Sequence, residues 1–226
     1  MKYSNIQKAI FVSRPNRFVA KVNIDGKETY VHVKNTGRCR ELLTEGAEVW
    51  LEKSDNPGRK YQYSLISVKK GGRMVNMDSQ APNKAVGEWL SEGVLFPDIK
   101  LIKAECKYGN SRFDFYVEYG DKRAFIEVKG VTLENGGVVS FPDAPTERGS
   151  KHLRELCECR NEGYEAYVIF VIQMKDVLYF TSNEKNDPVF AHTLENANKA
   201  GVSILAYDCL VTENEIKICN RVKVKI

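Results

Sequence analysis

The chain has 226 residues, of which 42% are hydrophobic, and a formal net charge of +4. Such a length and composition are ordinary for a globular protein with one large domain or two modest ones, and no apolar run approaches the roughly 18 residues of a membrane-spanning helix. The N-terminus also lacks the apolar region of a signal peptide, so we expect a cytoplasmic protein without a membrane partner.

The charge is unevenly distributed along the chain. Residues 1–80 contain 15 lysines and arginines against 8 acidic residues, whereas the remainder contains 19 against 22. A basic first third is a weak indication of a polyanionic partner such as nucleic acid, although an ordinary solvated surface explains the same balance. The six cysteines and three histidines are scattered without zinc-ligand spacing, which indicates reduced thiols and no histidine-rich metal site.

Residues 14–80 contain a succession of short strand-like segments. They are R-F-V-A-K-V-N-I (17–24), E-T-Y-V-H-V (28–33), A-E-V-W-L-E-K (47–53), Y-Q-Y-S-L-I-S-V-K-K (61–70) and R-M-V-N-M (73–77). Turn signals separate them at D-G (25–26), N-T-G (35–37), D-N-P-G (55–58) and G-G (71–72). Five short strands over this length predict a small OB-like barrel, a fold that often binds nucleic acid through aromatic and basic residues.

Basic residues of this region are the candidate nucleic-acid contacts. They are Arg17, Arg38, Arg40, Arg59 and Lys60. Aromatic residues lie beside them, namely Phe18, Tyr30, Trp50, Tyr61 and Tyr63. Because aromatic side chains of a small barrel are more often core than stacking surface, we favour the basic residues, most of which lie in predicted turns.

After residue 80 the pattern changes, so we divide the chain into domains at 1–80 and 81–226. The second part shows a predicted helix at 84–93, strands at 99–108, 111–119 and 123–133, a helix at 146–163, an apolar strand at 166–172, a helix at 188–200 and a strand at 202–207. The apolar strand is expected at the centre of a sheet. The predicted order is α-β-β-β-α-β with a βα extension, in an α/β fold.

Charged residues interrupt two of these strands. Phe113 and Phe115 are expected on one face of their strand and Asp114 on the other, while Glu127 and Lys129, two residues apart, share a face of the next strand. If the two strands form a hairpin, Asp114 lies near Glu127 with Lys129 one step along. Glu88, on the preceding predicted helix, is expected to assist at the same place.

This set of residues suits metal-assisted hydrolysis of a phosphodiester. Mg²⁺, or Mn²⁺ in its place, is held by one or two carboxylates together with waters and phosphate oxygens. A lysine beside such a site offsets the negative charge that develops during hydrolysis. The alternative is a solvated ladder of alternating charges, which is common on exposed strand faces.

The spacing of Asp114, Glu127 and Lys129 within this element order resembles the PD-(D/E)xK nuclease fold, although Phe113 stands where that motif often has proline. Nearly the whole chain is similar to the bacterial sugar fermentation stimulation protein A family. The similar segments include H-V-K-N-T-G-R (32–38), S-D-N-P-G-R-K-Y (54–61), I-E-V-K-G-V-T-L (126–133) and the long F-P-D-A-P-T-E-R-G-S-K-H-L-R-E-L (141–156).

The resemblance implies an N-terminal OB-like domain and a C-terminal nuclease-like domain that bind DNA without sequence preference, with a link to regulation of maltose and other sugar metabolism. It further implies that Asp114 and Glu127 are metal ligands and Lys129 the catalytic lysine. A non-catalytic DNA-binding regulator that keeps the nuclease fold as a scaffold is the alternative function. A module that binds protein partners is a third hypothesis, and the sequence does not indicate an oligomeric state.

The segment 141–156 is predicted to start a helix, with Thr146 as its N-cap. Arg148, Lys151 and His152 follow in its first turns, beside the strand that carries Glu127. We expect these three residues on the substrate side of the site, although a solvated helix face explains the same spacing.

Overall fold

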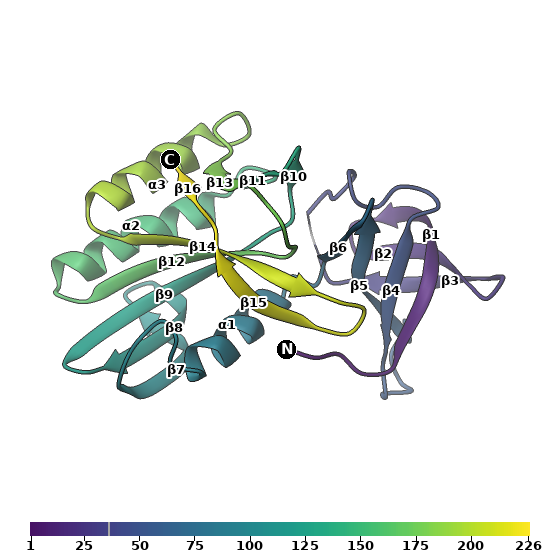
Figure 1. Ribbon diagram of the computed structural model, residues 1–226, viewed down its shortest axis with the longest axis horizontal. Coiled ribbons are helices and arrows are strands. Elements are labelled where there is room, and N and C mark those ends of the chain that lie inside the picture. Colours follow the sequence, from purple (N-terminus) through teal and green to yellow (C-terminus); the bar gives the residue numbers. More distant parts are fainter. Residues whose placement is uncertain (36) are drawn as a thin grey trace.

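The computed structural model describes residues 1–35 and 37–226, which fold into a β-barrel and a larger α/β domain lying side by side (Figure 1). Thr36, within the predicted N-T-G turn, lies outside the described residues.

The described residues of the N-terminal domain form strands and no helix. The strands are β1 (Ile6–Asn16), β2 (Val19–Ile24), β3 (Lys27–Val33), β4 (Glu48–Lys53), β5 (Tyr63–Lys70) and β6 (Arg73–Asn76). Strands β1 to β5 close into a barrel because β3, already antiparallel to β2, also pairs in parallel with β5 through His32 opposite Ser64. The predicted OB-like barrel is therefore confirmed.

The predicted strand set differs from the observed barrel in one member. The prediction missed β1 and counted residues 73–77, which form β6, a hairpin partner of β5 outside the closed ring. Only Ala9 and Phe11 of β1 are buried, and Ile10 between them is an exposed apolar residue. Because apolar residues of β1 are both buried and exposed, the strand does not show the alternation of apolar and polar residues on which strand prediction depends.

The C-terminal domain contains the predicted elements in the predicted order, together with strands that were not predicted. Its helices are α1 (Ala81–Ser91), α2 (Glu147–Asn161) and α3 (Pro188–Lys199). Its strands are β7 (Ile99–Tyr108), β8 (Ser111–Tyr119), β9 (Lys122–Val131), β10 (Glu134–Asn135), β11 (Val138–Phe141), β12 (Glu165–Ile172), β13 (Tyr179–Ser182), β14 (Ser203–Val211), β15 (Ile216–Arg221) and β16 (Val224–Lys225). The strands that were not predicted are β10, β11, β13, β15 and β16. Helix α1 begins at Ala81, earlier than predicted, because a proline in the first helical turn costs no hydrogen bond.

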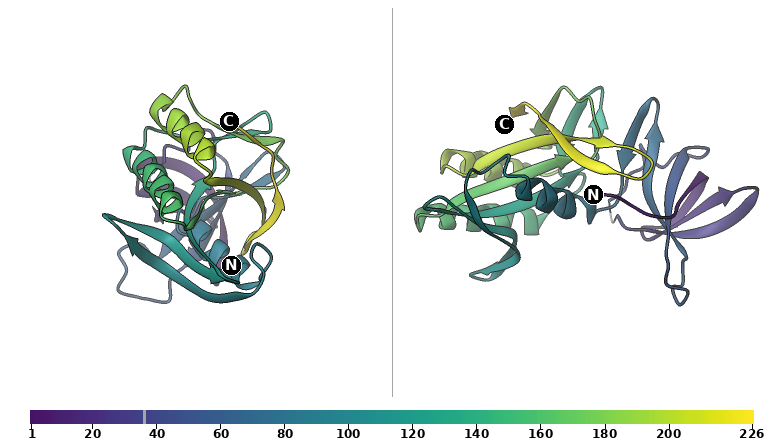
Figure 2. Two further views of the ribbon diagram at one scale, coloured as in Figure 1. Left: turned by 90° about the vertical axis from the view of Figure 1, so that its left-hand side faces the viewer. Right: turned by 60° about the horizontal axis from the view of Figure 1, so that its bottom comes forward.

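A six-stranded mixed sheet forms the centre of this domain, in the order β15-β14-β12-β9-β8-β7. Strand β12 pairs in parallel with β9 and β14, so the apolar run at 166–172 is the central strand that the sequence predicted. Helix α1 covers one face of the sheet, while α2 and α3 cover the other (Figures 1 and 2). No helix of the described ranges is long and apolar enough to cross a membrane.

A second, four-stranded sheet of β10, β11, β13 and β16 was not predicted. Its strands have two or four residues each, too few to show a periodic pattern. Strand β11 leads directly into the F-P-D-A-P-T segment, so this sheet helps to set where α2 begins.

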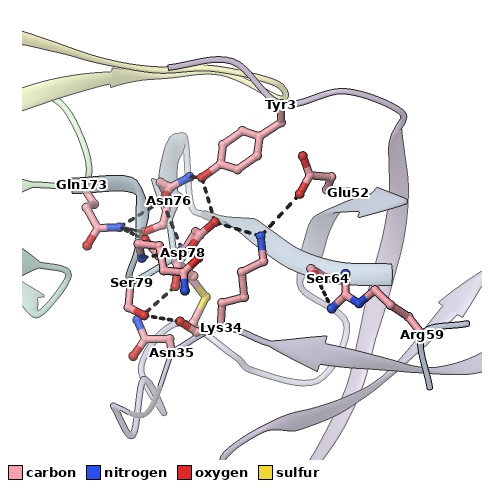
Figure 3. Close-up of polar contacts among 12 residues, drawn as sticks. Tyr3, Lys34, Asn35, Glu52, Arg59, Ser64, Asn76, Asp78, Ser79 and Gln173 are labelled. Atoms are coloured by element: carbon pink, nitrogen blue, oxygen red, sulfur yellow. Dashed lines mark hydrogen bonds and ion pairs between the residues drawn. The ribbon is translucent and has the colours of Figure 1, made fainter. Parts of the chain in front are cut away.

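The two domains meet at a buried polar network, drawn in Figure 3. The side-chain amide of Gln173, 2% exposed at the end of β12, donates to the backbone oxygens of Asn76 and Asp78 and to Asn76 Oδ1, at 2.9 to 3.2 Å. The Asn76 amide donates in turn to the Tyr3 hydroxyl at 2.9 Å, and Asp78 pairs with Lys34 at 3.2 Å. Each of these buried groups has a partner, so the network fixes the linker between the domains.

The N-terminal residues form a second connection. The Met1 ammonium donates to the Ile216 backbone oxygen at 2.8 Å, and the Tyr3 backbone N–H donates to the Asn214 oxygen at 2.8 Å. The chain thus begins on the C-terminal domain, enters the barrel at β1 and returns to the C-terminal domain after β6.

We predict that Gln173→Leu lowers the free energy of unfolding by about 2–4 kcal/mol, because it removes three buried hydrogen bonds and places an apolar side chain against the oxygens of Asn76 and Asp78. Urea unfolding followed by circular dichroism measures the change. Gln80→Leu, at an exposed position whose side chain makes no capping bond, is the matched control and is expected to have little effect. Equal losses in the two variants would show that the network does not stabilise the junction.

Candidate functional site

The site is built where β8 separates from β9. The two strands are paired from Tyr119 opposite Lys122 to Phe115 opposite Ile126. Continued pairing would place Asp114 opposite Glu127, but here the Asp114 carboxylate enters the ladder, and its Oδ2 accepts the Val128 backbone N–H at 2.7 Å. The strands fork at this residue, and the fork sets how the Asp114 carboxylate lies beside Glu127.

The fork changes the face on which Phe113 lies. Its ring packs near Phe125 and edge-on to His152, at centroid distances of 5.5 and 5.9 Å, on the side of the sheet covered by α2. Phe115 packs with the core on the α1 side. The prediction that the two phenylalanines share a face is wrong, because β8 twists as it leaves β9.

Glu127 is almost fully buried, at 4% exposure. Its Oε1 accepts from Lys129 Nζ at 2.6 Å and lies 2.5 Å from His152 Nδ1. Its Oε2 is buried and has no hydrogen-bond partner within residues 1–35 and 37–226. One carboxylate oxygen is therefore satisfied twice, and the other is left for a ligand.

The two carboxyl groups differ in proton affinity. Burial raises the pKa of Asp114 to about 6, and the charge of Glu127 adds to the increase, against the opposing effect of the hydrogen bonds from Val128 and Asn83. For Glu127, burial also acts to raise the pKa, but the hydrogen bond with His152 and the charge of Lys129 outweigh it and hold the pKa below its usual value. Near neutral pH both groups are ionised, and a cation between them would relieve their repulsion.

Helix α1 supplies Asn83, not Glu88, to this cluster. Asn83 Nδ2 donates to Asp114 Oδ1 at 2.6 Å. Glu88 pairs with the Met1 ammonium at 2.6 Å and is 60% exposed. Five residues rotate a helix position by about 140°, so the two side chains point in different directions. The prediction that Glu88 assists at the site is therefore wrong. The sequence analysis missed Asn83, because an asparagine in the first turn of a helix gives no distinctive signal.

The donors present fit a hard divalent cation. Within the described part of the chain no three His, Cys, Asp or Glu side chains form a group able to hold a metal. The oxygen donors that lie together here are the carboxylates of Asp114 and Glu127, and Glu127 Oε2 has no partner among the described residues. One or two carboxylates suit a hard divalent cation, which completes its shell with other oxygen ligands.

Helix α2 begins where the sequence predicted, with the Thr146 hydroxyl accepting the Gly149 backbone N–H at 3.1 Å. The helix brings His152 onto Glu127, and Arg148 Nε lies 3.4 Å from His152 Nε2. Lys151 is exposed and donates to the Asn110 backbone oxygen at 3.4 Å. All three predicted residues lie beside the site, but His152 contacts the proposed metal ligand itself.

An open groove of about 540 Å³ adjoins His152. It is lined by Asn110, Ser111, Arg112, Glu147, Arg148, Lys151, His152 and Arg154. Four of these side chains are cationic and one is acidic, so the groove suits an anion such as a phosphate. Arg112 and Arg154 were not among the predicted contacts, because they come from different elements and meet only in the fold.

The predicted contacts of the barrel lie in its loops. Arg17, Arg38, Arg40 and Lys60 are exposed, while Arg59 is half-buried and donates to Ser64 Oγ at 3.3 Å. Arg14, which the prediction missed, donates to the backbone oxygens of Arg17, Asn35, Gly37 and Arg38 at 2.7 to 2.9 Å. Arg14 therefore holds together the loops that carry Arg17 and Arg38.

The aromatic residues of the barrel divide into core and surface. Trp50 is buried at 4% exposure, as expected of a core residue, whereas Phe18 and Tyr30 are 47% and 53% exposed. The Arg17 guanidinium lies 5.2 Å from the centre of the Phe18 ring. These two rings are thus exposed on the surface of the barrel.

The loop that follows β3 meets the end of the β9 site strand at the domain junction. A cavity of about 160 Å³ is lined by Asn35 and Gly37 of that loop and by residues 130–133, which directly follow Lys129. A Cβ atom on Gly130 would lie 2.5 Å from Gln173 Oε1 and 2.9 Å from Pro82 Cγ. A glycine after Lys129 thus lets the linker and β12 pack against the end of the site strand.

Comparison with known proteins gives matches over both domains. The SfsA N-terminal OB domain matches residues 12–77, and the domain described as "Sugar fermentation stimulation protein RE domain" matches residues 80–215. A sugar fermentation stimulation protein homolog from Clostridium beijerinckii is 61% identical over 224 residues, which cover 99% of each chain. Another from Ruminiclostridium cellulolyticum is 57% identical over 226 residues and the full length of both chains.

A solved structure is also similar over the whole chain. It is SfsA of Pyrococcus furiosus, described as a complex with Ca²⁺, with a TM-score of 0.87 and 29% sequence identity. The match covers 100% of this chain and 98% of that chain.

We predict that Asp114 makes the stability of the metal-free protein depend on pH. Because its folded-state pKa of about 6 lies above the unfolded value, its contribution is complete below about pH 4 and is lost as the pH rises through 6. Relative to Asp114→Asn, the wild type should lose about 1–3 kcal/mol of unfolding free energy between pH 4.5 and 7.

Urea titrations with a chelator at several pH values measure this difference. Asp121→Asn, at a fully exposed aspartate, should track the wild type at every pH. A wild-type difference from Asp114→Asn that stays constant over this range would contradict the raised pKa.

Proposed function

The chain belongs to the sugar fermentation stimulation protein family, and from this premise we propose that it binds DNA without sequence preference and hydrolyses phosphodiester bonds with Mg²⁺ or Mn²⁺. The observation that carries the proposal is the arrangement at the fork, where the half-buried Asp114 carboxylate lies near the buried Glu127 and its neighbour Lys129, and Glu127 Oε2 has no partner among the described residues. We further propose that the protein affects sugar metabolism, including that of maltose, through its binding to nucleic acid.

In this proposal, Asp114 and Glu127 hold the cation. The chemistry that a bound divalent ion supplies is polarisation of the phosphate and activation of a water molecule. Asn83 and the Val128 N–H fix the Asp114 carboxylate, and Glu127 Oε1 holds the Lys129 ammonium beside the metal ligands. Lys129, whose side chain is 14% exposed, then offsets the negative charge that develops on the phosphate.

The similar Pyrococcus protein supports a divalent cation, since its structure is described as a complex with Ca²⁺. Ca²⁺ and Mg²⁺ are both hard ions that take oxygen ligands. We propose Mg²⁺ or Mn²⁺ for this chain because two carboxylates leave room for waters and phosphate oxygens.

The nucleic acid would lie along cationic groups on both sides of the site. The groove at Arg148 and Lys151 adjoins His152 on one side, and the barrel loop with Arg38 and Arg40 meets the end of β9 on the other. Both surfaces favour a polyanionic backbone over a neutral ligand.

We predict that Lys129→Ala reduces the rate of DNA cleavage in the presence of Mg²⁺ or Mn²⁺ by about 10²–10³-fold, because the charge on the phosphate is no longer offset. Gel assays with single- and double-stranded DNA and RNA measure the rate. Lys185→Ala, at an exposed lysine in the turn before α3, is the control and should cleave like the wild type. Cleavage that is absent from the wild type, or equal in all three proteins, would reject the enzymatic function.

The alternative function is a non-catalytic DNA-binding regulator. The exposed arginines of the barrel loops favour it, since they contact backbone phosphates without requiring any chemistry. Binding that persists with a chelator and in Asp114→Asn, without turnover, would identify this function.

We predict that the double variant Arg38→Ala/Arg40→Ala binds DNA more weakly and with a smaller salt dependence. If both side chains contact phosphates, the slope of log K against log salt should become shallower by about 1–2. Fluorescence anisotropy at several salt concentrations gives the slope. An unchanged slope would show that this loop does not contact the DNA backbone.

A further inference from the structure

His152 is held in one position by groups on two sides. Its side chain is 4% exposed, and its ring meets Phe113 edge-on at 72°. Its Nδ1 lies 2.5 Å from Glu127 Oε1, while Nε2 lies 3.4 Å from Arg148 Nε. The ring is therefore fixed by packing and by a polar contact at each nitrogen.

The contacts of His152 define its tautomer. An arginine guanidinium only donates hydrogen bonds, so the Nε2 that faces Arg148 must accept. The ring proton that faces Glu127 is consequently on Nδ1, and Nδ1–H donates to Glu127 Oε1. Arg148 thus acts on Glu127 through the imidazole.

This hydrogen bond decides how the Glu127 carboxylate is turned. Lys129 also binds Oε1, but its ammonium is at the end of a flexible side chain, whereas the imidazole is locked by its surroundings. With both donors on Oε1, the buried Oε2 is the oxygen that stays free within the described ranges. A carboxylate free to rotate would not present this oxygen consistently.

We propose that His152, held by Arg148, is a positioning residue that orients Glu127 so that its Oε2 binds the divalent cation shared with Asp114. The inference rests on the proposed metal site and adds a role for a residue that the sequence placed on the substrate side. Outer partners of this kind orient metal ligands, and their loss typically weakens metal affinity by about 10–100-fold.

Isothermal titration of the full-length protein with MnCl₂ tests the proposal without any cleavage assay. His152→Ala should weaken Mn²⁺ binding by about 10–100-fold. His152→Asn, whose amide places an N–H near the position of Nδ1, should retain most of the affinity. Glu158→Ala, at an exposed position on the same helix, is the matched control and should bind like the wild type.

The outcomes separate this inference from the proposed function. If wild type and His152→Ala bind Mn²⁺ equally while Asp114→Asn does not bind, the metal site stands and the role of His152 is rejected. If His152→Asn loses as much affinity as His152→Ala, orientation through the Nδ1–H bond is rejected. If the wild type does not bind Mn²⁺, the metal site itself is rejected, and this inference with it.

Thermal melts establish whether each variant is folded. Should His152→Ala fail to fold, Arg148→Met tests the same chain of contacts, because it removes the donor to Nε2 and leaves the imidazole in place. Arg148→Met is expected to weaken Mn²⁺ binding less than His152→Ala does. Wild-type affinity in Arg148→Met would overturn the role assigned to Arg148.

Discussion

One hydrogen bond determines the geometry of the candidate site: the Val128 backbone N–H is donated to the carboxylate of Asp114 and not to the backbone of β8. Because of it, the two strands diverge at Asp114, and the side chain of an otherwise ordinary strand residue is drawn into the space beside Glu127. The same divergence turns Phe113 toward α2, where its ring supports His152. Without the fork, Asp114 and Glu127 would be an ordinary cross-strand pair of like charges, which destabilises a sheet.

The fork has an electrostatic cost, and residues from three elements offset it. Helix α1 supplies Asn83 to Asp114, β9 supplies Lys129 to Glu127, and α2 supplies His152 to Glu127. These elements are adjacent only in the observed sheet order, with the helices on opposite faces. An unpartnered buried charge is strongly unfavourable. These contacts therefore stabilise the two carboxylates, and of their oxygens only Glu127 Oε2 is left without a donor among the described residues.

Features that follow from the local periodicity of apolar and charged residues could be predicted from the sequence. The proximity of Asp114, Glu127 and Lys129 could be predicted because residues two apart on a strand share a face, and the central strand 166–172 because it is uniformly apolar. Glu88 was misplaced and Asn83 missed, because the rotation of a helix about its axis is set by packing. The contact between His152 and Glu127 joins residues 25 apart in the sequence, which no local pattern encodes. Strand β1 was missed because its apolar residues lie on both faces.

The chain crosses the domain junction twice. Residues 1–3 pair with residues 214–216 of the C-terminal domain, so the barrel is connected to that domain on both sides, before β1 and after β6. A rigid body tethered at one point can rotate about three axes, but one tethered at two points can only swing about the line between them. The Gln173 network opposes that remaining motion. The two connections and the network together restrain the position of the barrel loops relative to the carboxylates of Asp114 and Glu127.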